Sequence, residues 1–279
     1  MSLWRIFWQG CMRKVSWLNK YLSYLVLGFK KTREYPANLF NQLFIPILIF
    51  GSLYAIWFFI FQNSSGVVNG FAFDDMILYL LVTTIFQGIL FYRICIELDY
   101  LMSSGDILRY TTKPVNFLLA IFSYYIGFNL VNVIVRMFML FFISFFVIGF
   151  VPSISYLLLF FAFIPLYVVM DGLIYSLIGL TAFWLTKTWG IRSAYEMVQW
   201  IFSGALIPIV FFPFWLQSLV KFTPFYYTMY SAASIFSQSF SISESFFVLK
   251  MLLVWIVIFS VLVWFIMRLG LKKLQVMGG

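Results

Sequence analysis

Residues 117–150 read FLLAIFSYYIGFNLVNVIVRMFMLFFISFFVIGF, and this apolar stretch holds one charge, Arg136, and no proline. A transmembrane helix needs about 20 mostly apolar residues to cross about 30 Å of hydrocarbon. At 1.5 Å per residue, a straight helix over this stretch would be about 51 Å long. We therefore expect a membrane span whose first turns lie along the cytoplasmic surface, with a break near Gly127.

Five further apolar stretches accompany it, at residues 39–61, 76–95, 156–185, 197–216 and 246–267. Over the 279 residues, 64% are hydrophobic and 10% are charged, against about 25% charged in an ordinary soluble domain. A single globule of this size cannot bury so much apolar surface in water. The sequence predicts an all-α polytopic membrane protein with six transmembrane helices. It forms a single domain over 1–279, with a cytoplasmic or interfacial segment 1–36, spans over 39–267 and a cytoplasmic tail 268–279.

The distribution of basic residues predicts the orientation. If both termini are cytoplasmic, fifteen of the eighteen Lys and Arg residues fall on the inner side. Lys221 and Lys250 fall outside, and Arg136 lies within a span. Because inner loops of membrane proteins carry the excess of positive charge, we expect a multi-pass protein of the cell membrane with cytoplasmic N and C termini.

The segment before the first span has a helical pattern. Leu18, Leu22, Leu25 and Phe29 recur at steps of three and four residues, and polar residues take the other side. Such a pattern is typical of a helix lying in contact with lipids at the membrane interface. A non-specific basic anchor is the alternative interpretation.

Composition excludes several classes of function. The chain has no histidine, which many intramembrane hydrolases and acyltransferases use as a base or metal ligand. Cys11 and Cys95 are far apart and suggest neither a disulfide framework nor a metal site. The net charge of +9 is spread over the ends of the spans, so it does not indicate a nucleic-acid partner. We expect no catalytic, metal-binding or cofactor-binding residue.

Two loops stand out. The inner loop over 97–116 is polar, and Ser104, Asp106 and Pro114 suit the cap, first turn and end of a short surface helix.

The stretch 207–227, IPIVFFPFWLQSLVKFTPFYY, is apolar but interrupted by Pro208, Pro213 and Pro224. Because proline stops a continuous helix, we expect short re-entrant or interfacial helices on the outer side, over residues 213–240. An ordinary aromatic belt is the alternative.

These features together resemble an ABC-transporter type-2 permease, closest to a subfamily associated with antibiotic or multidrug export. The resemblance rests on the six-span layout, the N-terminal helix, the loop 105–114 (GDILRYTTKP) and the proline-rich outer segment. It implies an ATPase-coupling loop with the matching residues Gly105, Asp106, Arg109, Lys113 and Pro114. It also implies an outer segment that caps the pathway, with the matching residues Pro213, Pro224 and Phe225. The polar residues 110–112 depart from the family pattern.

The chain lacks the G-x-x-x-x-G-K-[ST] pattern of a phosphate-binding loop. We therefore expect a transport permease that is not itself an enzyme. The resemblance implies partner ATPase subunits that bind ATP and Mg, and a second permease subunit, identical or paralogous, in a prokaryotic membrane. It further implies outward movement of an amphipathic drug, lipid or peptide by alternating access, among surrounding membrane lipids.

Two other classes remain open. An ion-coupled secondary transporter would carry inverted repeats and several intramembrane acids, but Asp171 is the only acid deep in a span. A membrane lipid-modifying enzyme is suggested by Asp74 and Asp75, which lack a third acid at helical spacing.

Arg136 and Asp171 are the charges well inside the predicted spans. Counted from the outer ends of the third and fourth spans, they lie about 20 and 22 Å deep. An unpaired charge at such depth costs about 2.5 to 3.5 kcal/mol on insertion scales. We therefore predict an ion pair between two adjacent spans, which either holds them together or lines the substrate pathway.

Overall fold

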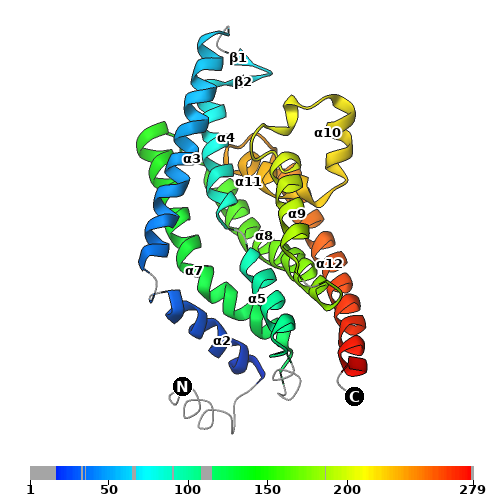
Figure 1. Ribbon diagram of the computed structural model, residues 1–279. Helices are drawn as coiled ribbons and strands as arrows, with labels where there is room; N and C mark the ends of the chain where they lie inside the picture. Colours follow the sequence, from blue (N-terminus) through cyan, green and yellow to red (C-terminus); the bar gives the residue numbers. More distant parts are fainter. Residues whose placement is uncertain are drawn as a thin grey trace.

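The computed structural model describes residues 17–32, 34, 36–64, 67–89, 91–107, 115–185 and 187–277. In this part of the chain, long helices lie side by side (Figure 1). The elements are α2 (Trp17–Thr32), α3 (Pro36–Gln62), β1 (Val67–Val68), β2 (Phe71–Ala72), α4 (Phe73–Gln87), α5 (Tyr92–Ser103), α7 (Phe117–Ile143), η1 (Ser144–Ile148), α8 (Ile154–Leu180), η2 (Thr181–Phe183), α9 (Trp189–Phe202), η3 (Ile209–Phe211), α10 (Phe214–Lys221), η4 (Pro224–Tyr227), α11 (Met229–Phe236) and α12 (Ile242–Met277).

Five segments of the described chain are long and apolar enough to cross a membrane. They are Phe44–Gln62, Phe73–Ser103, Phe117–Ile148, Ile154–Phe183 and Ile242–Lys273. Apart from a two-stranded antiparallel hairpin of β1 and β2, the regular structure described is helical. The protein is thus an all-α polytopic membrane protein, as its composition predicts.

The predicted fifth span, residues 197–216, is not a continuous helix. Its first part belongs to α9, which has 14 residues and ends at Phe202. Gly204 follows with φ of 74°, and Pro208 directly precedes the short 3-10 helix η3. A left-handed residue and a proline both interrupt helical hydrogen bonding, so the apolar run continues as separate short helices.

The predicted break near Gly127 is wrong, because α7 runs without interruption from Phe117 to Ile143. Gly127 lies where α2 crosses α7. A Cβ atom there would come within 1.9 Å of the Leu25 carbonyl oxygen, and one at Gly28 within 1.9 Å of the Tyr124 carbonyl oxygen. The two glycines therefore permit close packing of two helix backbones, as small residues do in membrane proteins.

The predicted N-terminal helix is present as α2, and it lies along the lower part of α7 (Figure 1). The Thr32 hydroxyl donates a hydrogen bond of 2.8 Å to the Phe128 carbonyl oxygen and so ties the end of α2 to α7. Residues 1–16 of the predicted N-terminal segment lie outside the described residues.

After α9, the chain passes through η3, α10 and η4 and reaches α11, which lies in the interior of the molecule. Every residue of α11 is buried, against α4 and α8. The Tyr79 hydroxyl on α4 donates a hydrogen bond of 2.5 Å to the Gly204 carbonyl oxygen, and the Tyr230 amide donates one of 2.9 Å to the Ser203 carbonyl oxygen. These bonds satisfy backbone groups that the break after α9 leaves free.

Candidate functional site

The predicted second span, residues 76–95, is two helices with a break between them. Helix α4 ends at Gln87 and α5 begins at Tyr92. The helical ladder is interrupted here: the Gly88 and Ile89 amides close the last turn of α4 onto the Ile85 and Phe86 carbonyl oxygens, and the remaining carbonyl groups of α4 and the first amide groups of α5 lack regular helical partners. At membrane depth, such groups must be satisfied by the protein itself.

Arg136 on α7 supplies donors to the end of α4. Its Nη1 donates to the Ile85 carbonyl oxygen at 3.3 Å, and its Nε donates to Oδ1 of Asn132 at 2.7 Å. Asn132 in turn donates from Nδ2 to the Gly88 carbonyl oxygen at 2.9 Å. A positive charge at a helix C-terminus also complements the helix dipole, so Arg136 is well placed to stabilise this end.

Gly88 makes room for the guanidinium group. A Cβ atom at this position would lie 1.8 Å from Cζ of Arg136 and 2.0 Å from both of its terminal nitrogens. Any larger residue would therefore push the arginine out of its place. The break in the second span and the buried charge on α7 depend on one another.

Asp171 on α8 accepts a hydrogen bond from the backbone at the start of α5. Its Oδ2 accepts a hydrogen bond of 2.8 Å from the Phe91 backbone amide, and the residue is 1% exposed. A negative charge at a helix N-terminus has the favourable sign. The two buried charges thus hold the two sides of one helix break.

The predicted ion pair between Arg136 and Asp171 is not formed. The ion pairs found among the described residues are Lys31 with Glu34 and Arg192 with Glu196. The prediction assumed that α7 and α8 are neighbours because they follow one another in the chain. The two helices do touch, since the Phe141 and Phe161 rings stack at a centroid distance of 5.8 Å, but α5 contacts both of them and each charge meets the backbone of the broken span.

The second carboxylate oxygen of Asp171, Oδ1, belongs to a group of buried polar atoms without hydrogen-bond partners in the described chain. The group comprises the Tyr167 and Tyr195 hydroxyls, Oδ1 of Asp171 and the Gln199 side-chain amide. The Gln199 amide approaches the Asp171 carboxylate without reaching hydrogen-bond geometry. Buried polar atoms of this kind commonly bind internal water. The region between α8 and α9 therefore has the polar atoms that buried water molecules need.

On the opposite side of the break, a cavity of about 210 Å³ opens between α3, α4, α5 and α7. Arg136 and Asn132 lie at its wall together with Gly88. The other residues lining it are Asn41, Ile45, Gln87, Tyr92, Arg93, Phe128 and Asn129. Arg136 therefore faces a space large enough for a small polar group.

The predicted coupling loop begins directly after α5. Gly105 has a φ of 72°, the conformation with which helices often end. The Ser104 hydroxyl oxygen accepts a bond of 3.3 Å from the Asp106 amide, and Asp106 lies in a turn. Arg109, Lys113 and Pro114, with most of the predicted short helix, lie outside the described residues.

The three residues predicted to belong to the outer segment, Pro213, Pro224 and Phe225, lie between α9 and α11. Pro213 directly precedes α10, and Pro224 is the first residue of η4. The Phe225 ring packs against Tyr195 and Phe202 of α9, at centroid distances of 5.9 and 6.3 Å. Within the described part of the chain, the Phe225 ring therefore contacts α9 and not Arg136.

Sequence reasoning missed Gly88 and the Phe91 amide as partners of the buried charges. A signal existed, because Gly88 interrupts an otherwise apolar run (FQGILF, residues 86–91). The spacing of Asn132 and Arg136, four residues apart, also indicated a shared helix face. Which backbone they would meet could not be read from that spacing.

Comparison with known proteins adds one finding. A family model described as "ABC-2 family transporter protein" matches residues 46–278. No curated protein matches the sequence.

Proposed function

Since the chain belongs to the ABC-2 transporter family and is a membrane permease of an ABC transporter, we propose that it moves an amphipathic substrate outward by alternating access. Separate ATPase subunits would bind ATP and Mg and drive the motion. A second permease subunit, identical or paralogous, would complete the membrane part. The substrate would be a drug, a lipid or a peptide.

The observation that carries this proposal is the position of α5. Its N-terminus lies at the charged break, and its C-terminus leads into Gly105 and Asp106 of the coupling loop. With 12 residues it is about 18 Å long. A movement of the loop would therefore be passed along one short rigid helix to the break. Conformational changes of proteins are commonly absorbed by a few residues at the ends of helices, and the break before α5 is such a place.

The orientation proposed for the chain agrees with the arrangement of the elements. The C-terminal ends of α5 and α12 lie at one end of the molecule, and α10 and the hairpin lie at the other (Figure 1). The first end carries Arg268, Lys272 and Lys273 on α12. A cytoplasmic location of this end is thus consistent with the positive-inside rule. The membrane that we propose is a prokaryotic cell membrane, with cytoplasmic N and C termini.

The test is assembly with a candidate ABC ATPase, and an ATPase gene adjacent to this one would be the first choice. Purified alone, the permease should show no ATP hydrolysis, and co-expressed it should purify with the ATPase. The double variant Asp106→Lys with Arg109→Glu should reduce the yield of the complex by about tenfold, the equivalent of about 1.4 kcal/mol. The reason is that both charges change sign on the surface that meets the ATPase. Membrane insertion should be unchanged.

The matched control reverses an acid and a base at the opposite end of the molecule, Asp75→Lys with Lys221→Glu. Both side chains are exposed there, so the complex should form in normal yield. Equal yields from the two double variants would remove the loop from the coupling mechanism. Transport by the permease alone, driven by an ion gradient in proteoliposomes, would instead establish a secondary transporter.

A further inference from the structure

The cavity beside the helix break is cationic. The residues that line it include two arginines, Arg93 and Arg136, and four with side-chain amides: Asn41, Gln87, Asn129 and Asn132. None of the described residues that line it is acidic. The two guanidinium groups give this wall a positive charge, which suits an anion with several acceptor oxygens.

The charge of Arg136 is unusual for its depth. The residue is 6% exposed, and its hydrogen-bond acceptors in the described chain are a carbonyl oxygen and an amide oxygen, both neutral. A buried cation is normally paired with an anion or faces a water-filled space. Since Asp171 does not fill this role, the cavity itself is the place from which a counter-ion can reach Arg136.

Arg93 is held at the rim of the same cavity by aromatic rings. Its guanidinium carbon lies 5.1 Å from the centroid of Phe128 and 5.7 Å from that of Tyr92. Glu97, one turn along α5, accepts a hydrogen bond from the Tyr125 hydroxyl at 3.2 Å. The ring contacts orient Arg93 and leave its N–H groups able to donate to a guest.

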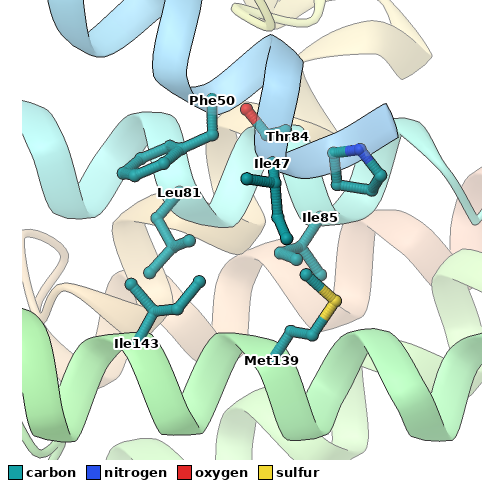
Figure 2. A pocket seen from close by; sticks show the side chains of 8 residues that line it. Ile47, Phe50, Leu81, Thr84, Ile85, Met139 and Ile143 are labelled. Carbon is teal, nitrogen blue, oxygen red and sulfur yellow. The ribbon is translucent and has the colours of Figure 1, made fainter. Parts of the chain in front are cut away.

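An apolar pocket of about 50 Å³ lies between α3, α4 and α7 (Figure 2). Met139 and Ile143 line it from α7, about one and two turns beyond Arg136. Ile85, whose carbonyl oxygen Arg136 contacts, also lines it. The remaining lining residues are Pro46, Ile47, Phe50, Leu81 and Thr84. The cationic cavity and the apolar pocket thus lie along one seam, the contact of α3 with α4 and α7.

We propose that this seam binds a single anionic amphiphile. A phosphate or carboxylate head group occupies the cationic cavity, with Arg136 and Arg93 as donors. The alkyl chain runs along α7 past Met139 into the apolar pocket. Planar guanidinium groups suit such head groups because they donate two parallel hydrogen bonds. The same chemistry fits a phospholipid of the membrane or a transported anionic molecule, and for the transported molecule the inference rests on the proposed function.

The test measures binding to the purified permease, with no ATP and no ATPase. The probe is dodecyl phosphate, and the comparison compounds are 1-dodecanol and inorganic phosphate at constant ionic strength. Dodecyl phosphate should raise the midpoint of thermal unfolding of the wild-type protein, and dodecanol should not. The variants Arg136→Gln and Arg93→Gln should each weaken the apparent affinity at least tenfold. Arg268→Gln, which removes an arginine that lies over Trp264 on α12, is the matched control and should bind normally.

Each result has a defined meaning. Stabilisation by inorganic phosphate as well would show that the head-group cavity accepts a free anion, and stabilisation by dodecyl phosphate alone would show that the alkyl chain is needed. Stimulation of ATP hydrolysis in the complex would identify a transported molecule, and binding without stimulation a resident lipid. If Arg136→Gln does not fold, Arg93→Gln carries the test. Equal binding by wild type and Arg93→Gln, or equal stabilisation by dodecanol, would overturn the proposal. A failure to assemble with the ATPase would leave the binding result unaffected.

Discussion

Replacing Gly127 with alanine is expected to detach α2 from α7 and destabilise the protein. The added Cβ atom would meet a backbone carbonyl group of Leu25 at 1.9 Å, and a backbone cannot rotate away as a side chain can. Overpacking of this kind costs about 3 kcal/mol. That loss corresponds to roughly 6–12 °C in the midpoint of thermal unfolding for a domain of 150–250 residues. Thermal unfolding of the purified protein, followed by size-exclusion chromatography, measures it.

Gly51→Ala is the matched control, because Gly51 is also within a long helix and has no atom within 4 Å of its would-be Cβ. It should be neutral or slightly stabilising, as alanine is the better helix former. Gly28→Ala should behave like Gly127→Ala, since its Cβ would meet the Tyr124 carbonyl oxygen. If both variants at the crossing unfold like the wild type, the close packing of α2 on α7 is incorrect.

Exchanging the two buried charges, Arg136→Asp together with Asp171→Arg, is expected to leave the protein unfolded. The exchange places a carboxylate against the Ile85 carbonyl oxygen and a guanidinium group against the Phe91 amide. Each site then holds a charge of the wrong sign. Breaking the partners of a buried charge costs about 3 to 5 kcal/mol, so the double variant should be less stable than either single variant. The yield of folded protein in detergent and its unfolding temperature report the effect.

The more conservative variant Asp171→Asn separates charge from hydrogen bonding. Its amide oxygen can still accept from the Phe91 amide, so the fold should survive. Asp171→Leu removes the acceptor and leaves that amide group unsatisfied, at a cost of about 1 to 3 kcal/mol. A rescue of folding by the double charge exchange would show that Arg136 and Asp171 interact with each other rather than with the helix break.

The helix break links the two proposals made above. Its α5 side leads to the proposed coupling loop, and its α4 side is held by Arg136 at the wall of the cationic cavity. A head group bound in that cavity and a movement of α5 would therefore act on the same few backbone groups. Transport requires coupling of this kind between the ATPase surface and the site that holds the cargo.

The sequence by itself determined the membrane class of the protein and most of its helices. Apolar runs of sufficient length predict spans because burial in lipid depends on composition along a single stretch of chain. The stretches 39–61 and 246–267 lie within α3 and α12, and residues 156–180 of the stretch 156–185 lie within α8. The helical pattern of leucines likewise predicted α2, since it depends only on local spacing.

Which elements touch one another was decided only by the tertiary structure. Gly127 was expected to break a helix, but it is the place where α2 meets α7, because a glycine's role depends on what approaches it. Arg136 and Asp171 were expected to pair, but α5 contacts both of their helices and the backbone of the broken span receives both charges. Hydropathy records how well a residue suits lipid, and it contains no information about which neighbour satisfies a buried polar group. That choice depends on contacts between residues far apart in the chain, and these exist only once the helices have packed.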